Sequence, residues 1–256
     1  MSDAHAIGID CGSTFCKGAL LSAEGECLKK ILKPSGWDLA ATGRAMVEEF
    51  FQFIPTGSAK VPVVATGYGR SSIREADHTV TEISCHALGA EILRPGTRTV
   101  VDIGGQDCKV IALNKGKVTS FHMNDKCAAG SGRFLEMVLG RLDADLRLMD
   151  VLLGEEKAVP LNSTCVVFAE TEIIGLLAKG ASRAEILGGV AASMAGRIAS
   201  LAAKVEINAP AILTGGLSSS FGLAEVLSKA LKVEVQTVPD GIFAGAFGAA
   251  IAGCRL

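Results

Sequence analysis

The feature that most constrains the fold of this chain is an internal repeat. Residues 10–17 read DCGSTFCK and residues 102–109 read DIGGQDCK, so Asp, Gly, Cys and Lys recur in order at an offset of 92. In both copies an apolar run precedes the glycine turn (AIGI and TVV) and another follows it (GALL and VIAL). A strand, a tight glycine turn and a returning strand are typical of a β-hairpin. Two matching hairpins predict two lobes of related fold.

The rest of the chain alternates between β-rich runs and helical periodicity, which favours an α/β fold. Strands are expected in VPVVATG, AILTGG and KVEVQTV, and helices in TGRAMVEEFFQFI, VTEISCHALGAEIL, FGLAEVLSKAL and FAGAFGAAIAG. Further helices are expected at about residues 128–141 and 183–205, with a polar loop after the first of them. We expect lobe one to cover residues 1–97, closed by the C-terminal helix at 241–256, and lobe two to cover residues 98–240.

Composition excludes several classes of protein. The chain has 256 residues, 49% of them hydrophobic, which is enough for a core in one large domain or two small lobes. The formal net charge of −2 provides no basic surface, so nucleic acid is not expected as a partner. No apolar run is long enough to span a bilayer, and the N-terminal MSDAHAIGID leaves no room for a signal peptide. We therefore expect a cytoplasmic protein without a membrane partner.

The eight cysteines are not expected to form structural disulfides, because the cytoplasm keeps thiols reduced. The sequence has no CxxC pair and no Cys/His spacing typical of zinc. Most free cysteines are small buried hydrophobic residues, and Cys16 and Cys108 fit that interpretation because strand residues flank them. Cys11 lies in the first hairpin and is assigned no chemistry.

Three glycine turns are candidates for phosphate binding. The chain has no P-loop signature, but the first hairpin offers backbone N–H groups, the hydroxyls of Ser13 and Thr14, and the ammonium of Lys17. DIGGQD provides a second turn and LTGGLSS a third, where bare backbone can lie against a ligand. Asp10 and Asp102 end the two repeated strands and are suited to Mg²⁺ held through water. Each turn alone could simply close a hairpin, whereas three turns and a repeat favour a nucleotide.

The segment NDKCAAGSGRFLE, residues 124–136, leaves three interpretations of Cys127 open: a nucleophile, a residue of a phosphate loop, or a metal ligand. Cys127 and Cys165 each precede an apparent helix, CAAGSGRFLEMVLG and CVVFAETEIIGLLA. A helix N-terminus carries partial positive charge, which favours a thiolate. The pair is therefore a candidate for metal ligation.

These motifs resemble those of a known superfamily. IGIDCGSTFCKGALL, VVDIGGQDCKVIAL, AILTGG and AGAFGAAIAG are similar to the phosphate-1, phosphate-2, adenosine and connecting motifs of the actin, Hsp70 and sugar-kinase superfamily. VVATGYGR, TEISCHALGA, NDKCAAGSGRFLE and the segment around Cys165 resemble a narrower group, the ATP-dependent activators of 2-hydroxyacyl-CoA dehydratases, related to the ATPase subunits of benzoyl-CoA reductase. The resemblance covers nearly the whole chain.

The resemblance implies two ribonuclease-H-like lobes with a Mg·ATP cleft between them, and a homodimer that shares one [4Fe–4S] cluster. Carried over by position, the cluster ligands are Cys127 and Cys165. A four-iron cluster needs four thiolates, and two chains related by a two-fold axis provide them.

The expected site residues follow from the turns and from the resemblance. Asp10, Lys17, Asp102 and Gln106 are expected to act in hydrolysis, with Asp10 and Asp102 around Mg²⁺ and Gln106 orienting the attacking water. The residues expected to contact the nucleotide lie in the three turns and after Cys127: Gly12, Ser13, Thr14, Phe15, Cys16, Lys17, Gly104, Gly105, Gln106, Gly130, Gly132, Arg133, Gly215 and Gly216.

The function implied is an ATPase that drives low-potential one-electron transfer. The dimer would accept an electron from reduced flavodoxin or ferredoxin and pass it to an iron–sulfur dehydratase. A benzoyl-CoA-reductase-type or double-cubane-cluster reductase is an alternative partner. Two rival functions remain: a small-molecule kinase, for which Asp107 and Asp125 are the nearby candidate bases, and a cluster carrier that binds ATP without turnover.

Overall fold

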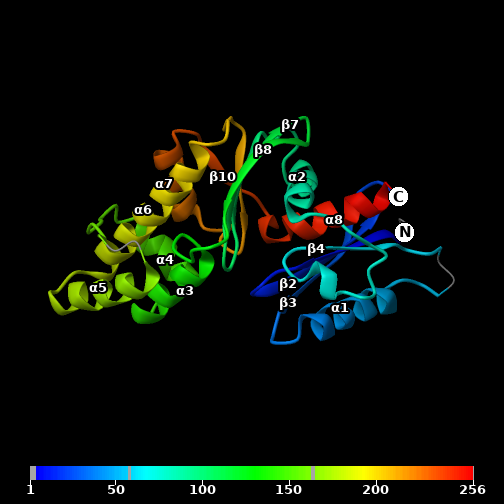
Figure 1. Ribbon diagram of the computed structural model, residues 1–256, viewed down its shortest axis with the longest axis horizontal. Coiled ribbons are helices and arrows are strands. Elements are labelled where there is room, and N and C mark those ends of the chain that lie inside the picture. Colours follow the sequence, from blue (N-terminus) through cyan, green and yellow to red (C-terminus); the bar gives the residue numbers. More distant parts are fainter. Residues whose placement is uncertain (1–3, 57–58, 163–164, 256) are drawn as a thin grey trace. The chain divides into compact units, whose positions relative to one another are not determined.

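The computed structural model describes residues 4–56, 59–162 and 165–255, shown in Figure 1. The chain divides into two compact units. The first unit comprises residues 1–97, 113–119 and 240–256, and the second comprises residues 98–112 and 120–239.

The first unit is built on a five-stranded sheet in the order β3-β2-β1-β4-β5. Its strands are β1 (Ala4–Cys11), β2 (Phe15–Ser22), β3 (Cys27–Pro34), β4 (Val63–Thr66) and β5 (His78–Thr79). The β1–β2 and β2–β3 pairs are antiparallel, while β4 pairs parallel with β1 and β5 pairs parallel with β4. The β1–β2 pair confirms the first predicted hairpin.

Helices α1 (Leu39–Phe53), α2 (Glu82–Leu93) and α8 (Ala244–Cys254) complete the first unit, with short 3₁₀ turns η1 (Arg70–Ser72) and η2 (Gly241–Phe243). Figure 1 shows α2 and α8 side by side, and α8 also packs on β1. Glycine makes this close packing possible. A Cβ atom on Gly8 of β1 would lie 2.1 Å from the carbonyl oxygen of Ala246, and one on Gly89 of α2 would lie 1.9 Å from that of Ala244.

The sheet of the second unit has the same arrangement, with strand order β10-β9-β6-β7-β8. Its strands are β6 (Thr99–Ile103), β7 (Cys108–Asn114), β8 (Lys117–Asn124), β9 (Ala211–Gly215) and β10 (Val235–Thr237). β6 pairs antiparallel with β7 and parallel with β9, as β1 does with β2 and β4. The repeat in the sequence is therefore a repeat of the fold, and the prediction of two related α/β lobes is confirmed.

The helices of the second unit are α3 (Gly132–Arg141), α4 (Leu146–Leu153), α5 (Val166–Ala178), α6 (Arg183–Ala202) and α7 (Phe221–Leu231). A large core cluster lies in this unit and takes side chains from the sheet and from all five helices. No helix among the described residues is long and apolar enough to cross a bilayer.

Three predicted elements differ from those observed. The helix expected to begin at about residue 128 begins at Gly132, because Ala128–Ser131 form a tight turn closed by the Ser131 N–H on the Ala128 carbonyl at 2.9 Å. The segment expected to be a polar loop contains α4, whose N-cap Asp145 accepts from the backbone N–H of Leu148. The last strand, β10, is shorter than KVEVQTV, because Lys232 takes a left-handed backbone conformation at the end of α7.

Candidate functional site

The first hairpin joins an acidic and a basic side chain at the base of its glycine turn. Asp10 on β1 lies directly opposite Lys17 on β2, and Nζ of Lys17 is 3.1 Å from Oδ2 of Asp10. The turn between them is closed by the N–H of Gly12, which donates to the carbonyl of Phe15 at 3.2 Å. Asp10 is 3% exposed, so the ion pair stands beneath the turn rather than in open solvent.

Two buried oxygens of this hairpin lack an internal partner. Within the described residues, Oδ1 of Asp10 and Oγ1 of Thr14 are buried and form no hydrogen bond. An unsatisfied buried polar oxygen costs free energy, so such atoms commonly mark the place of an ion, water or ligand. A carboxylate oxygen suits Mg²⁺ or one of its water ligands, and a threonine hydroxyl suits a phosphate oxygen. The first hairpin therefore fits a magnesium-bound phosphate.

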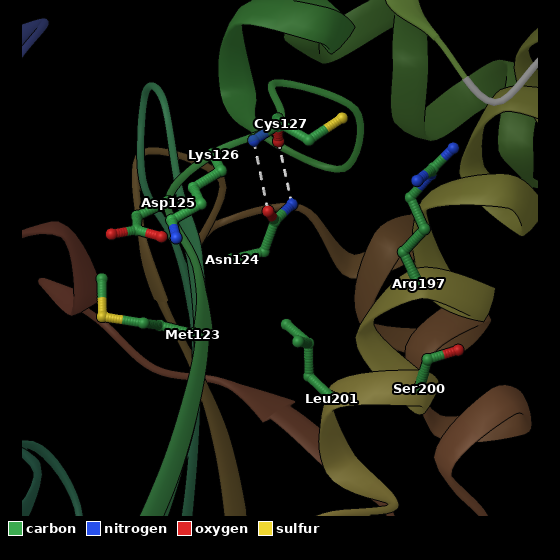
Figure 2. A pocket seen from close by; sticks show the side chains of 8 residues that line it. All are labelled: Met123, Asn124, Asp125, Lys126, Cys127, Arg197, Ser200 and Leu201. Atoms are coloured by element: carbon green, nitrogen blue, oxygen red, sulfur yellow. Dashed lines mark hydrogen bonds between the residues drawn. The ribbon is translucent and has the colours of Figure 1, made fainter.

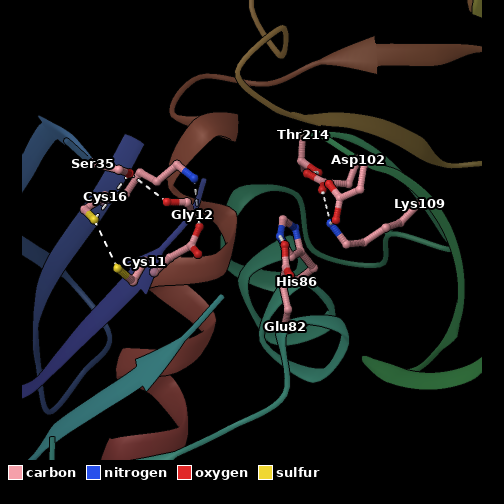
Figure 3. Close-up of polar contacts among 12 residues, drawn as sticks. Cys11, Gly12, Cys16, Ser35, Glu82, His86, Asp102, Lys109 and Thr214 are labelled. Carbon is pink, nitrogen blue, oxygen red and sulfur yellow. Dashed lines mark hydrogen bonds and ion pairs between the residues drawn. The ribbon is translucent and has the colours of Figure 1, made fainter. Parts of the chain in front are cut away.

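A chain of thiol and hydroxyl groups lies next to the ion pair (Figure 3). The sulfurs of Cys11 and Cys16 are 3.2 Å apart, and Cys16 Sγ is 3.6 Å from the hydroxyl oxygen of Ser35. Ser35 donates its single hydroxyl hydrogen to the carbonyl of Gly12 at 2.6 Å, so its oxygen is left to accept from Cys16. Donation from the Cys11 thiol lowers the pKa of Cys16 to about 7 and raises the pKa of Cys11 itself.

The second hairpin repeats the acid–base pair in a more enclosed form (Figure 3). Asp102 lies opposite Lys109, with Nζ and Oδ2 3.2 Å apart, and the Gly104 N–H donates to the Asp107 carbonyl at 3.0 Å. Lys109 is 1% exposed and also pairs with Asp107 at 2.8 Å, while Thr214 donates to Oδ1 of Asp102 at 2.8 Å. Both oxygens of Asp102 are thus engaged within the protein, whereas one oxygen of Asp10 is not.

The third glycine turn lies at the same edge of the second sheet. β9 runs parallel to β6 and places Thr214 beside Asp102 and Gly215 beside Ile103. Gly215 has φ of +87°, and a Cβ there would lie 2.2 Å from the Ile103 carbonyl oxygen, so only glycine fits. A Cβ on Gly216 would meet nothing within 4 Å. The backbone at Gly216 is consequently open to a ligand.

Cys127 is exposed and is held by its backbone (Figure 2). The side-chain amide of Asn124 donates to the Cys127 carbonyl at 2.8 Å, and the Cys127 N–H donates to the Asn124 amide oxygen at 3.2 Å. The thiol points away from Asn124 in Figure 2. A pocket of about 440 Å³ adjoins this segment and is lined by Met123, Asn124, Asp125, Lys126, Cys127, Arg197, Ser200 and Leu201. The two hydrogen bonds to Asn124 therefore hold the backbone of Cys127 in place and leave its thiol exposed.

The N-terminus of α3 is hydrogen-bonded to the second glycine turn, residues 104–107. The N–H of Gly132 donates to the Gly104 carbonyl at 2.8 Å, and the N–H of Arg133 donates to the Gly105 carbonyl at 2.9 Å. The first amides of α3 are thus directed at the turn and not at Cys127, which corrects the expectation that Cys127 immediately precedes a helix N-terminus. The same two hydrogen bonds connect the cysteine segment to the turn.

Cys165 occupies the N-cap of α5 and is exposed. The following helix is apolar on its solvent side, where Val167 and Phe168 are each 68% exposed and Ile174 is 49% exposed. The ion pair of Arg141 with Glu170, with Nε and Oε1 2.8 Å apart, links α5 to the end of α3. Two exposed cysteines, one in the segment before α3 and one at the N-cap of α5, are residues of the type that ligates an iron–sulfur cluster.

The other predicted contact residues are more peripheral. Phe15, the first residue of β2, and Gln106 are exposed, and Ser13 is half-buried. Cys16, which was expected to contact the nucleotide, is 0% exposed and lies beneath the turn. The guanidinium of Arg133 pairs with Glu136 at 2.8 Å, while its backbone N–H donates to the second turn. Gly130, with φ of +97°, lies against the stem of Arg197.

Sequence reasoning missed four residues that shape the site: Ser35, Asn124, Lys109 and Thr214. Lys109 could have been found, because it matches Lys17 in the repeat. The other three act through contacts between segments distant in sequence or through local backbone geometry, and no pattern of residues marks them.

Two known proteins are similar to this chain over nearly its whole length. The chain is 39% identical to the (R)-2-hydroxyglutaryl-CoA dehydratase activating ATPase of Acidaminococcus fermentans, over 96% of either chain. It is 32% identical to one of the subunits of benzoyl-CoA reductase from Thauera aromatica, over 96% of this chain and 92% of the relative.

Two solved structures are similar over nearly their whole length. The crystal structure of component A of the Acidaminococcus fermentans (R)-2-hydroxyglutaryl-CoA dehydratase superposes with a TM-score of 0.91 at 38% identity, covering 99% of this chain and 98% of that one. The activator of the 2-hydroxyisocaproyl-CoA dehydratase from Clostridium difficile, with bound ADPNP, gives a TM-score of 0.89 at 34% identity, covering 98% and 94%. The family model of the BadF/BadG/BcrA/BcrD ATPases matches residues 7–253. This chain, with its duplicated Asp–Lys hairpins, belongs to the BadF/BadG/BcrA/BcrD ATPase family.

Proposed function

We propose that this protein is an ATP-hydrolysing activator that, as a homodimer holding one [4Fe–4S] cluster, delivers single electrons at low potential to an iron–sulfur dehydratase. The observation that carries the proposal is the link between the two kinds of site. One exposed cysteine segment is bonded through α3 to the second phosphate turn, and another exposed cysteine begins the neighbouring helix. The named relatives, a dehydratase activating ATPase and a benzoyl-CoA reductase subunit, support the class of partner.

Each hairpin has its own part in nucleotide binding. In the first, Lys17 and the backbone of Gly12–Thr14 bind phosphate, and Asp10 holds Mg²⁺ or its water through the unpaired Oδ1. In the second, Asp102 is held by Lys109 and Thr214, so its carboxylate is fixed in place for a water ligand of the metal. Gln106, exposed on the turn, orients the attacking water. The bound ADPNP in the structure of a relative supports ATP as the ligand.

Cys127 and Cys165 hold the cluster, which supplies one-electron transfer when bound. Two cysteines from each of two chains satisfy its four ligand positions, so the homodimer is a condition of the metal site. The exposed apolar residues that follow Cys165 on α5 give the second subunit a surface to cover. Reduced flavodoxin or ferredoxin is the proposed electron donor, and a benzoyl-CoA-reductase-type or double-cubane-cluster reductase is the alternative acceptor.

Movement of the second phosphate turn must be passed to the cysteines by residues of this chain. α3 is tied to the turn at its N-terminus and to α5 near its C-terminus through Arg141 and Glu170. A displacement of Gly104 and Gly105 on nucleotide binding therefore moves two helices together. This is how the fold would couple hydrolysis to the orientation of the cluster.

Anaerobic purification tests the proposal. We expect a brown protein with about four irons per dimer and a Mg²⁺-dependent ATPase activity. Cys127→Ala and Cys165→Ala should each lose the iron, while Cys27→Ala, which removes an exposed cysteine of the first unit, should keep it. A colourless monomer that phosphorylates a sugar would overturn the proposal in favour of a kinase, and an iron-loaded dimer without ATP turnover would favour a cluster carrier.

A further inference from the structure

Two thiols face each other at the base of the first phosphate turn, although neither has a part in the proposed mechanism. Cys11 and Cys16 are directly opposite on β1 and β2, and both are 0% exposed. Their sulfurs are 3.2 Å apart, at hydrogen-bonding distance. At the equivalent position of the second hairpin, Ile103 lies opposite Cys108, so the pair is a feature of the first hairpin alone.

The backbone geometry at this pair permits a covalent bond. The neighbouring pair is hydrogen-bonded, because the Gly12 N–H donates to the Phe15 carbonyl. Hydrogen-bonded and non-hydrogen-bonded pairs alternate along an antiparallel ladder, so Cys11 and Cys16 form a non-hydrogen-bonded pair with Cα atoms about 4.5 Å apart. That separation lies within the range of about 4.4–6.8 Å found for disulfides. The sulfurs need to approach by only about 1.2 Å to reach the bond length of about 2.05 Å.

The pair is placed where a bond would affect the phosphate turn. On one side is the Asp10–Lys17 ion pair, one residue along each strand, and on the other side is the turn that begins at Gly12. Ser35 connects Cys16 to the carbonyl of Gly12, so the thiol pair and the turn share a hydrogen-bond chain. A Cβ on Gly12 would lie 2.9 Å from the backbone carbonyl oxygen of Phe15, so the backbone of the turn is closely packed across Gly12.

We infer that Cys11 and Cys16 are a redox-active pair whose reversible disulfide weakens nucleotide binding at the first hairpin. Hydrogen peroxide is the oxidant, since it is little larger than water and can reach the pair when the turn opens locally. The Cys16 sulfur attacks one peroxide oxygen, giving a sulfenic acid and one water. The Cys11 sulfur then displaces the sulfenic oxygen as a second water, so that two thiols and one peroxide become one disulfide and two waters. A dithiol reverses the reaction by thiol–disulfide exchange.

Peptide mapping tests the covalent step without reference to nucleotide. Trypsin releases residues 1–17 as one peptide that contains both cysteines, because Lys17 is the first basic residue of the chain apart from His5. After peroxide treatment of the full chain and alkylation, we expect this peptide to be about 2 Da lighter than its dithiol form and to carry no alkyl group. Dithiothreitol should restore two alkylation sites. The inference is overturned if the peptide stays doubly alkylated at a peroxide concentration that oxidises the exposed Cys27.

Cys11→Ser is the matched variant, because it keeps the size of the buried side chain and removes one sulfur. Cys11→Ala serves the same purpose if the hydroxyl impairs folding, and circular dichroism checks both variants. Cys85→Ala removes another buried cysteine of the same unit and should leave the peptide mass shift unchanged.

The effect on the ligand rests on the proposed function and is measured separately. We expect the dissociation constant for Mg·ATP to rise about tenfold on oxidation and to recover with dithiothreitol, while the Cys11→Ser variant shows no peroxide-dependent change beyond that of cluster loss. A disulfide that leaves the dissociation constant unchanged would refute the effect on binding. If the reduced chain binds no Mg·ATP, the proposed function fails while the mass shift still decides the disulfide.

Discussion

At the scale of single residues, the two repeated hairpins have the same acid–base pair in different surroundings. Asp10 shares one oxygen with Lys17 and leaves the other without a partner among the described residues, whereas Asp102 is engaged by Lys109 and Thr214. A carboxylate with an unpaired oxygen is available to a cation, and one enclosed by its own chain is held in place. The residues of the repeat therefore differ in what their removal should do.

Asp10→Asn and Asp102→Asn should separate activity from stability. We expect Asp10→Asn to lower the ATPase rate about 100-fold, equivalent to about 3 kcal/mol of transition-state stabilisation, with a smaller loss of unfolding free energy than Asp102→Asn, because Lys17 is more exposed than Lys109. Asp102→Asn breaks a buried ion pair of Lys109 and should cost about 3 kcal/mol of stability. Urea unfolding and ATP turnover are the measurements. Equal losses of stability in the two variants would contradict the distinction.

The buried thiol of Cys85 predicts a loss of stability at alkaline pH. Burial raises the pKa of Cys85 from 9.0 to about 12, so the folded state keeps a proton that the unfolded state releases above pH 9. The stabilisation is fully present below pH 9, the pKa of this thiol in the unfolded state. It is lost as the pH rises towards the pKa of about 12 in the folded state, by up to about 4 kcal/mol. Cys85→Ala should therefore lose less unfolding free energy than the parent between about pH 9 and pH 11. If the unfolding free energies of the parent and of Cys85→Ala fall equally with pH, Cys85 is not the cause of the alkaline loss of stability.

At the scale of helices and strands, the sequence predicts those elements whose pattern is local. Both hairpins, α7 and the strand of AILTGG lie where periodicity and turn residues place them. The start of α3 could not be predicted, because it depends on hydrogen bonds from Gly132 and Arg133 to a turn almost 30 residues earlier. Helix α4 could not be predicted for a different reason, because its eight residues are too few to show a clear helical period.

The packing of α8 on β1 can be tested by replacing Gly8 of β1 with alanine, with the same replacement at Gly196 of α6 as the control. Gly8→Ala would place a Cβ 2.1 Å from the backbone oxygen of Ala246 and should cost about 3 kcal/mol, since backbone cannot yield as a side chain does. Gly196→Ala lies within α6, meets nothing within 4 Å, and should stabilise the protein by about 1 kcal/mol. Urea unfolding compares both with the parent, and changes of the same sign would contradict this interpretation.

The two hydrogen bonds between the Asn124 side chain and the Cys127 backbone predict an effect on retention of the proposed cluster. Asn124→Ala removes both bonds, so the ligand segment should loosen and iron should pass to a chelator at least about fivefold faster. Asn124→Asp keeps the acceptor for the Cys127 N–H and should have a smaller effect. Iron release is followed by absorbance under anaerobic conditions. The same release rate in all three proteins would exclude a role for Asn124 in holding the ligand.

At the scale of the whole molecule, the two units share a fold but differ in their functional residues and helices. The first has the small-residue helix α8 and the less enclosed acid–base pair, and the second has both proposed ligand cysteines and the pocket beside Cys127. The repeat at an offset of 92 predicted this duplication, but not its asymmetry, because the burial of Lys109 arises from contacts with Asp107 and from the strands around it. The matching residues of the repeat therefore predicted a common fold for the two hairpins, but they did not predict how the functions of the two hairpins differ.

The proposed homodimer predicts a selective effect of charge on α5. Phe168 is 68% exposed and lies three residues after Cys165, so Phe168→Glu should weaken dimerisation at least about 100-fold while leaving both ligand cysteines intact. Phe51→Glu, at a 48% exposed side chain of the first unit, is the control and should leave the dimer unchanged. Analytical ultracentrifugation measures both, and an unaltered Phe168→Glu dimer would place the interface elsewhere.

The two hydrogen bonds from α3 to the second turn also limit how far the turn can move without moving the helix. Hydrogen bonds of 2.8 and 2.9 Å are near their best length, and they can stretch by only about 0.3 Å before they weaken markedly. Within that range the turn can fluctuate without consequence for the helix. Beyond it, the helix must follow or both bonds must break. On the proposed function, small thermal fluctuations of the turn would therefore leave α3 in place, whereas a larger displacement caused by nucleotide binding would move it.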